Sequence, residues 1–250
     1  MKKRFEKIIW DLMEDYCQEK QVPHMWEEPI VKFASADDPK FEQLKEIVVS
    51  NHYLPTDYLE EAVTVLSYFL PFKREIPQTN VAGEECSKVW ADSYLITNDM
   101  FGYINEHLAE VVRKMGYDAA IPQDAGMISL AVPKSRWSQR HVAYIAGHGT
   151  FGMNNMLISD KGSVGRYHSI VTTIPVEADV IPTEERCLYK KSGSCGLCFK
   201  RCMTGALTAD GFDRFKCLEQ CLENERKYPG ADVCGKCVVE LPCSHMELKN

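Results

Sequence analysis

The chain has 250 residues, 45% hydrophobic and 26% charged, which is typical of one large globular domain or of one domain with a small module. The net charge of −7 gives no basic footprint for nucleic acid, although a local basic patch is compatible with it. The charged, periodic N-terminus does not resemble a signal peptide, and the most apolar stretch, residues 62–72, is too short to cross a bilayer. We therefore expect a cytoplasmic protein without a membrane segment.

The first half of the chain predicts two helices and a buried strand. Apolar residues at helical spacing predict an amphipathic N-terminal helix, namely Phe5, Ile8, Ile9, Leu12, Met13 and Tyr16. Residues 24–60 are mixed and polar, so we expect helix and loop there. Residues 62–70 are β-branched and aromatic and predict a buried strand that Pro71 ends. A long helix should follow, capped by Thr97 and ending at Gly116.

The next part of the chain alternates between short extended segments and a helix. Residues 117–122 and 127–133 are predicted to be extended, and residues 137–145 to start a helix that leads into a glycine-rich loop. Residues 156–159 and 168–176 predict strands. This alternation favours an α/β (or α+β) layered fold.

The composition changes near Pro182. We expect an α/β domain over residues 1–183 and a small, cysteine-rich module over residues 184–250. The second segment has too few aliphatic residues for a core of its own, and such modules usually need a metal or a covalent staple.

Nine of the eleven cysteines lie between Cys187 and Cys243. The run Cys195, Cys198, Cys202 resembles a bacterial ferredoxin run whose first ligand is missing, because Ser192 stands in its place. Two [4Fe–4S] clusters need eight thiolates, and in two-cluster ferredoxins the last cysteine of each run binds the other cluster. We therefore expect Cys187 to replace the missing ligand over a longer loop.

This crossed spacing predicts two sets of metal ligands. The first cluster takes Cys187, Cys195, Cys198 and Cys243, and the second takes Cys202, Cys217, Cys234 and Cys237. Cys221 is left over, although it could replace Cys217. Two four-cysteine zinc sites are the alternative, since they use the same C-x-x-C pairs. The odd cysteine count argues against disulfides, and Cys17 is predicted to be a core residue.

A glycine-rich stretch contains G-x-G-x-x-G at Gly147, Gly149 and Gly152. Alone, this is weak evidence for a dinucleotide site. A Rossmann motif needs a strand before the first glycine, whereas a helix is predicted here, and Asn154 and Asn155 follow where that motif opens a helix. We therefore do not favour the Rossmann interpretation.

The order of these segments is similar to that of the epoxyqueuosine reductase family, which includes the corrinoid-dependent reductive dehalogenases. AGHGTFGMNNMLIS is followed by GSVGRYHSIVTT and then by the cysteine module. Upstream, AVTVLSYFLPF and the helix in YLITNDMFGYINEHLAEVVRKMGYDAAIP match segments of the same family. The resemblance covers the chain from about residue 60 to its end.

The resemblance implies a nitroreductase-like domain that binds cobalamin or another corrinoid, next to two clusters that reduce its cobalt. It implies an oxygen-sensitive reductase of a small substrate in an anaerobe, with reduced ferredoxin or flavodoxin as electron donor and a homodimer by fold analogy. It also implies a corrinoid pocket lined by Gly147, Gly149, Gly152, Asn154 and Asn155. The alternative is that these residues only form a tight turn.

The sequence also departs from the family pattern. Thr150 stands where the family has tryptophan, Met153 where it has lysine, and Met203 where a proline follows the ferredoxin run. The chain lacks the helical-repeat domain that helps the longer reductases to hold tRNA. With the acidic net charge, this argues against a tRNA substrate.

The acidic proton donor of epoxyqueuosine reductase has no counterpart in MISLAVPKSRWSQRHVAY. Three other residues are candidates for this role: Asp124 further upstream, Tyr94 by similarity to the dehalogenases, and His141 beside the glycine-rich loop. For His141, packing within a helix is the more ordinary explanation.

Two other functions remain open. The chain could be an electron-transfer protein or reductive activator of a partner corrinoid protein, with no substrate of its own. It could also be an iron–sulfur oxidoreductase that uses a flavin or a nicotinamide, since nitroreductase-like folds also bind flavin.

Overall fold

The structure, a computed structural model, describes residues 1–246. Its main helices are α1 (Lys2–Lys20), α2 (Lys40–Ile47), α3 (Pro55–Tyr58), α4 (Glu75–Gln78), α5 (Lys88–Lys114), α6 (Gln139–Ile145), α7 (Leu188–Ser192), α8 (Leu197–Arg201) and α9 (Arg214–Lys227), with a short 3₁₀ turn η1 (Lys236–Val238). Its strands are β1 (Ile30–Ser35), β2 (Thr64–Pro71), β3 (Ala119–Ala120), β4 (Thr150–Phe151), β5 (Leu157–Ile158) and β6 (Gly165–Thr172).

The main sheet has four strands in the order β1-β2-β6-β3, and each neighbouring pair is antiparallel. A separate hairpin pairs β4 with β5. The antiparallel pairing confirms the preference against a Rossmann interpretation, because that fold is built on parallel strands. The predicted α/β (α+β) class is confirmed, with the sheet of the α+β form.

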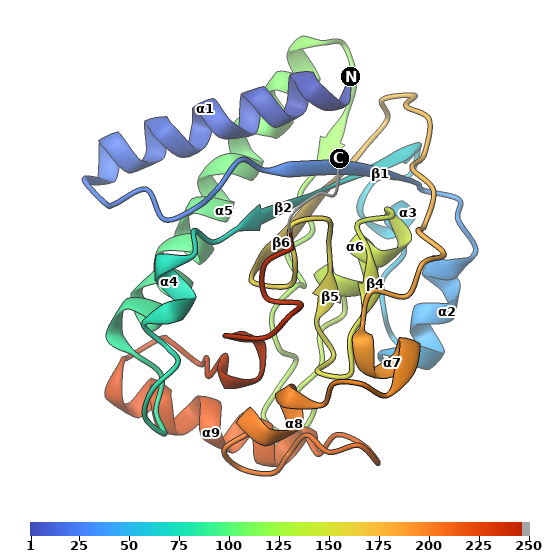
Figure 1. Ribbon diagram of the computed structural model, residues 1–250. Coiled ribbons are helices and arrows are strands. Elements are labelled where there is room, and N and C mark those ends of the chain that lie inside the picture. The colour runs from blue at the N-terminus through green and yellow to red at the C-terminus, as the bar shows by residue number, and fades with distance from the viewer. Residues whose placement is uncertain (247–250) are drawn as a thin grey trace.

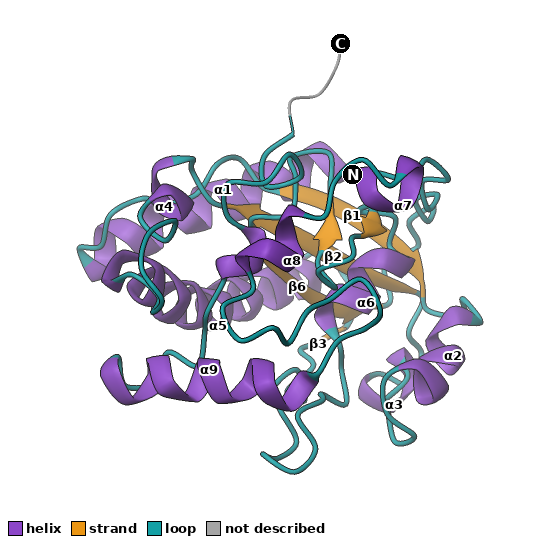
Figure 2. Ribbon diagram, turned by 60° about the horizontal axis from the view of Figure 1, so that its bottom comes forward, coloured by secondary structure: helices purple, strands orange, loops and turns teal. Residues whose placement is uncertain are grey.

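Helices cover both faces of this sheet (Figures 1 and 2). α1 and α5 pack on one face, and α6, with α2 against it, packs on the other. Every residue of β2 is buried, as expected for a strand covered on both sides. Leu66 and Tyr68 join the core under α1 and α5, whereas Val65 joins the core under α2 and α6.

Several predicted elements are confirmed: the N-terminal amphipathic helix, the strand that ends at Pro71, the helix that precedes the glycine-rich loop, and the strand within residues 168–176. β1 was missed, since residues 24–60 were expected to be helix and loop. Residues 127–133, expected to be extended, form bends and turns without a strand.

The start of the long helix was predicted wrongly. α5 begins after Ser87, whose hydroxyl accepts a hydrogen bond from the Trp90 amide, so Ser87 is the cap. Thr97 lies one-third of the way along the helix, where its hydroxyl donates to the Ser93 carbonyl and accepts the Trp26 indole N–H at 3.2 Å. A threonine inside a helix can satisfy its hydroxyl in this way and so resemble a cap in the sequence. Gly116, with φ +86°, does follow the end of the helix as expected.

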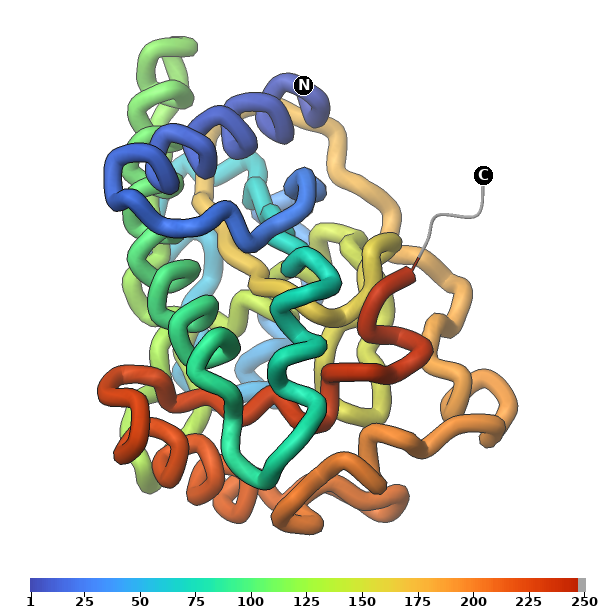
Figure 3. Tube along the Cα trace, turned by 60° about the vertical axis from the view of Figure 1, so that its left-hand side comes forward, coloured from blue at the N-terminus to red at the C-terminus, as the bar shows by residue number. Residues whose placement is uncertain are grey.

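The cysteine-rich segment contributes to the main core. Ala231, Val238 and Val239 are buried in the same cluster as residues of α1 and α5. In Figure 3 the C-terminal segment runs beside the loop after α4. The division at residue 183 remains a prediction, and the two segments share a hydrophobic core.

Candidate metal centre

The first predicted ligand set comes together around Cys198 and Cys243. The pKa of the Cys198 thiol is raised by burial and further by the nearby Cys187 and Cys195 thiols. Burial also raises the pKa of Cys243 to about 11, with contributions from Cys187 and Cys198. We call Cys187, Cys195, Cys198 and Cys243 the first cysteine group.

Arg186 fixes the position of Cys187. Its guanidinium donates to the carbonyls of His148 at 3.2 Å and Ile158 at 3.0 Å and to the Asp160 carboxylate at 2.5 Å. Cys187 then caps α7, the short helix formed by the loop that was expected to bend. The β4–β5 hairpin region therefore holds Cys187, whose role as the replacement for the ligand missing at Ser192 stays a prediction.

The second predicted set comes together around Cys237. Burial, together with the nearby Cys234, Cys217 and Cys202 thiols, raises the pKa of its thiol to about 12. Burial also raises the pKa of Cys234 to about 11, again with a contribution from Cys217. We call Cys202, Cys217, Cys234 and Cys237 the second cysteine group. Cys198 also contributes to the shift of Cys237, so the two groups are neighbours.

Cys221, the predicted spare, lies next to the second cysteine group. The neighbouring Cys221 thiol lowers the pKa of Cys217 to about 7, helped by Arg140 and Arg214. Cys234 is also close enough to raise the pKa of Cys221. Geometry alone therefore leaves open the alternative in which Cys221 replaces Cys217.

The thiols are gathered but are not arranged about a single ion. Among residues 1–246, no three His, Cys, Asp or Glu side chains form a group that could hold one metal ion. A cubane cluster is larger than an ion and spreads its thiolates further apart. In addition, the Sγ atom of Cys202 accepts a hydrogen bond from the Leu207 amide at 3.3 Å, a contact that stabilises a thiolate. The cysteines therefore fit clusters in kind and grouping, and the ligand sets remain predictions.

Two cations attach the second cysteine group to the loop after α4. Lys236 is only 2% exposed, and its ammonium donates to the carbonyls of Asn80 at 3.0 Å and Ala82 at 2.7 Å. Arg201 donates to the Val81 carbonyl between them at 2.9 Å. Figure 3 shows this loop beside the C-terminal segment.

The glycine-rich loop lies against the same group. The Asn154 amide donates to the Cys237 carbonyl at 2.9 Å. A Cβ atom on Gly149 would meet the Ile158 carbonyl oxygen at 1.9 Å, and one on Gly147, which has φ +84°, would meet the Val180 carbonyl oxygen at 2.7 Å. The chain's own packing thus requires these glycines, which supports the tight-turn interpretation and leaves a role in a cofactor pocket as a prediction.

The remaining predicted pocket residues lie close by. Gly152 would bring a Cβ within 2.8 Å of the Asn154 side-chain oxygen. Asn155 is exposed with φ 58°, and its carbonyl accepts the Arg140 guanidinium at 2.7 Å. The loop is thereby tied to α6 on one side and to Cys237 on the other.

Tyr94 and Asp124, two predicted proton donors, lie in different places and are already hydrogen-bonded. The Tyr94 hydroxyl donates to Asp232, and burial, the largest effect, raises its pKa. Asp124 accepts the Tyr58 hydroxyl at 3.1 Å, beside the core around Trp137. The structure does not bring Tyr94 and Asp124 together.

His141 is the third predicted proton donor. Burial and then the charge of Arg140 lower its pKa to about 4, so the imidazole is neutral at pH 7. Its Nδ1 atom lies 2.7 Å from the Ser138 hydroxyl, and its ring packs 4.9 Å from the Phe151 ring. These contacts suit a packed residue at the start of α6.

Sequence reasoning missed a second neutral imidazole, His168 on β6. The Tyr68 hydroxyl donates to the Asn105 Oδ1 atom at 2.9 Å, so the Asn105 amide nitrogen donates to His168 Nδ1 at 2.8 Å. His168 Nδ1 is then an acceptor, and the ring proton is on Nε2. Burial lowers the pKa of His168 to about 4. The sequence signal was the position of His168 two residues after Arg166 in the strand segment GRYHS, which places both side chains on one face of the strand.

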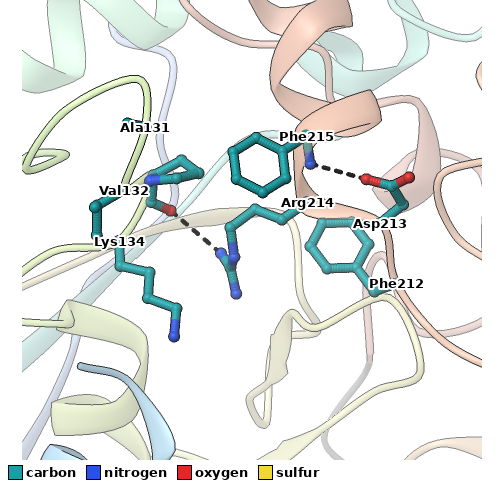
Figure 4. Close-up of a pocket in the computed structure, with 8 residues that line it drawn as sticks. Ala131, Val132, Lys134, Phe212, Asp213, Arg214 and Phe215 are labelled. Atoms are coloured by element: carbon teal, nitrogen blue, oxygen red, sulfur yellow. Dashed lines mark hydrogen bonds between the residues drawn. The ribbon is translucent and has the colours of Figure 1, made fainter. Parts of the chain in front are cut away.

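A pocket of about 350 Å³ lies where the 127–136 loop meets the start of α9 (Figure 4). Arg214 crosses it and donates to the Pro133 carbonyl at 3.4 Å, while Phe212 and Phe215 form apolar walls. The volume suits a small molecule. Arg214 connects this pocket to Cys217, whose pKa it helps to lower.

Comparison with known proteins places the fold. No protein-family model matches the chain, and no curated protein matches it. The structure of epoxyqueuosine reductase from Bacillus subtilis matches with a TM-score of 0.57 and 17% identity, over 97% of this chain and 68% of that one. Epoxyqueuosine reductase bound to a tRNA-Tyr stem loop matches with a TM-score of 0.58 and 19% identity, over 96% and 68%.

The catabolic reductive dehalogenase NpRdhA matches with a TM-score of 0.55 and 16% identity, over 87% of this chain and 30% of that one. This chain therefore spans about two thirds of the length of the epoxyqueuosine reductases and less than a third of the dehalogenase. Among its described residues, no helix is long and apolar enough to cross a membrane. The resemblance stated from the sequence is confirmed in structure: the chain has the fold shared by epoxyqueuosine reductases and reductive dehalogenases.

Proposed function

We propose that the protein is an iron–sulfur reductase that passes electrons through two [4Fe–4S] clusters to a small substrate. The observation that supports this proposal is the gathering of the predicted ligand cysteines on this fold: Cys198 and Cys243 pack with Cys202 and Cys237, and Cys198 also acts on the pKa of Cys237. Neighbouring clusters form a path along which an electron can move from one to the other.

The first cysteine group is the better entry point for electrons. Exposed lysines lie on the short helices beside it, Lys190 and Lys191 on α7 and Lys200 on α8. A cationic face of this kind favours an acidic donor such as reduced ferredoxin or flavodoxin through electrostatic steering.

The second cysteine group is the better exit, because the glycine-rich loop touches it. Asn154 is tied to Cys237, and Asn155 presents an exposed side chain from the same turn. These amides fit an amide-rich ligand such as a corrinoid and would hold it close to the second group. A corrinoid bound there would supply a cobalt centre that is strongly reducing and nucleophilic once reduced.

The alternative, an electron-transfer protein that activates a partner, has one specific observation in its favour. Two predicted proton donors are engaged elsewhere, since Tyr94 donates to Asp232 and Asp124 accepts from Tyr58. Substrate reduction needs protons as well as electrons, whereas an electron carrier needs none. The pocket beside Arg214 argues for the enzyme instead.

The test is the metal content of protein purified without oxygen, incubated with hydroxocobalamin and desalted. The reductase should retain about eight irons and about one cobalt per chain. About eight irons without cobalt would shift the proposal to the electron carrier or to a flavin enzyme, which a flavin spectrum would identify. About two zincs without iron would refute the redox function.

A further inference from the structure

The region between β6, α5 and α6 contains an arginine with an unused donor. Arg166 and His168 are two residues apart on β6, so both point to the α5 face of the sheet. Arg166 donates to the Asn98 Oδ1 atom at 2.9 Å, and its guanidinium lies 4.4 Å from the centre of the Tyr94 ring. Its Nη1 atom is buried and has no hydrogen-bond partner.

A second guanidinium enters the same region from the start of α6. Arg140 donates only to neutral acceptors, the Asn155 carbonyl at 2.7 Å and the Met156 sulfur at 3.2 Å. The carboxylate nearest to this region, Asp232, already accepts the Tyr94 hydroxyl. Among the described residues, therefore, neither guanidinium has a hydrogen bond to a carboxylate.

The local electrostatics agree with an excess of positive charge. Burial lowers the pKa of Arg140, and repulsion from Arg214 and Arg166 lowers it further, whereas the Cys237 and Cys217 thiols act in the opposite direction. The pKa of His141 is lowered by burial and by Arg140, and that of His168 by burial and by Arg166. Both arginine side chains are partly exposed, so a ligand from solvent can reach them.

We propose that Arg140 and Arg166 form an oxyanion-binding site beside the second cysteine group, which takes a carboxylate or phosphate of the small substrate. A buried donor without an acceptor is costly, and an oxyanion would accept from Arg166 Nη1. Guanidinium groups are suited to this because they present planar pairs of N–H donors. His168 Nε2, which carries its ring proton, adds a neutral donor on the same face.

This inference deepens the proposed function, because it names the class of substrate for the same site. The oxyanion could instead belong to the cofactor, since cobalamin carries a phosphodiester. The two sources can be told apart with cobinamide, a corrinoid that lacks this phosphate. Competition by cobalamin but not by cobinamide would assign the site to the cofactor's phosphate, and an effect of neither would assign it to the substrate.

The test measures binding of inorganic phosphate to the iron-loaded protein by calorimetry, with acetate as a competing carboxylate. We expect saturable binding, weakened about tenfold or more in Arg166→Gln and in Arg140→Gln. Arg226→Gln is the matched control, because Arg226 is an exposed arginine of α9 that pairs with Glu223, and it should bind like the parent protein.

Three results would overturn the proposal: no saturable phosphate binding, equal loss in Arg226→Gln, or unchanged binding in both site variants. A shift in cluster reduction potential without a change in phosphate binding would also overturn it, because the arginines would then only balance cluster charge. If Arg166→Gln fails to fold, Arg166→Lys replaces it. Arg166→Lys keeps the positive charge but loses the planar pair of N–H donors, so phosphate binding should weaken while the circular dichroism spectrum stays unchanged.

Iron and cobalt are measured on the same samples. If a variant loses phosphate binding but keeps its iron, the effect is confined to the oxyanion-binding site. If the parent protein contains no iron, the proposed function itself is refuted.

Discussion

The two cysteine groups differ in what holds them. The first is attached through Arg186 to the β4–β5 hairpin region and lies beside exposed lysines of α7 and α8. The second is attached through the buried Lys236 to the loop after α4, and the guanidinium groups of Arg140 and Arg214 lower the pKa of its Cys217. Cys187 and Cys198 of the first group are buried, whereas all four cysteines of the second group are partly exposed, so the two groups differ in the charges around them more than in depth.

This difference separates two tasks that an electron-transfer path must combine. A donor protein needs an accessible, charged docking face, which the first group has. A reacting centre needs a positively charged environment in which an accepted electron is stabilised, and Arg140, Arg214 and Lys236 supply one to the second group. We therefore expect the second cluster to have the higher reduction potential.

The largest effect should come from removing a ligand of one group. Cys187→Ala should lose about four of about eight irons, because the first cluster would lack the ligand that replaces the one missing at Ser192. Iron analysis and electron paramagnetic resonance of the reduced protein measure this loss. Cys221→Ala is the control and should keep about eight irons. The reverse pattern would show that the assignment of ligands is wrong.

A smaller effect should follow from replacing the cation that attaches the second group. Lys236→Met keeps the length of the side chain but leaves the carbonyls of Asn80 and Ala82 without their donor. An unsatisfied buried acceptor costs about 1–3 kcal/mol, so the free energy of unfolding in denaturant should fall by about that much for each carbonyl. Lys200→Met, at an exposed position, is the control. Equal stability of the two variants would contradict a structural role for Lys236.

The support of the first group can be tested at Gly149. A methyl group there would meet the Ile158 carbonyl oxygen, which also accepts Arg186. We expect Gly149→Ala to lower the free energy of unfolding by about 1–3 kcal/mol and to reduce iron occupancy of the first cluster only. Gly102→Ala, inside α5 with open space around it, should stabilise by about 0.5–1 kcal/mol. A stabilising effect at both glycines would refute the crowding at Gly149.

The smallest effect concerns the neutral histidines near the second group. His141 and His168 have pKa values of about 4 in the folded protein, below the value of about 6.5 expected when unfolded. The unfolded chain therefore binds protons first as the pH falls, and stability should decline from pH 7 to pH 5. Denaturant unfolding at several pH values measures this decline. His168→Gln should make it shallower, and an unchanged slope would count against a buried neutral His168.

Local patterns predicted most of the elements but not their partners. The spacing of Phe5, Ile9 and Met13 was sufficient for α1, and the β-branched run before Pro71 was sufficient for β2. β1 was hidden because its residues lie in a polar, mixed region, and its place in the sheet depends on pairing with β2. Strand order is a long-range property that a local pattern does not carry.

In the candidate site, too, local spacing was readable from the sequence, whereas long-range contacts were not. The spacing of the cysteines alone suggested two ligand sets; the structure brings Cys198 and Cys243 together with Cys202 and Cys237, and the division into sets stays a prediction. The contribution of Lys236 could not be read in advance, because a buried cation and an exposed one look alike in a sequence, and for Arg166 and His168 the only signal was their alternation along one strand. Cys86, to which no role was given, also acts electrostatically on Cys234.

The attachment of the loop after α4 has a consequence for assembly. Lys236 and Arg201 bind the backbone of residues 80–82, and none of these contacts uses a thiol. The cage for the second cluster can thus be closed by ordinary hydrogen bonds before any iron is delivered. We therefore expect this part of the chain to fold before cluster insertion, unlike a zinc finger, whose folding is driven by the metal.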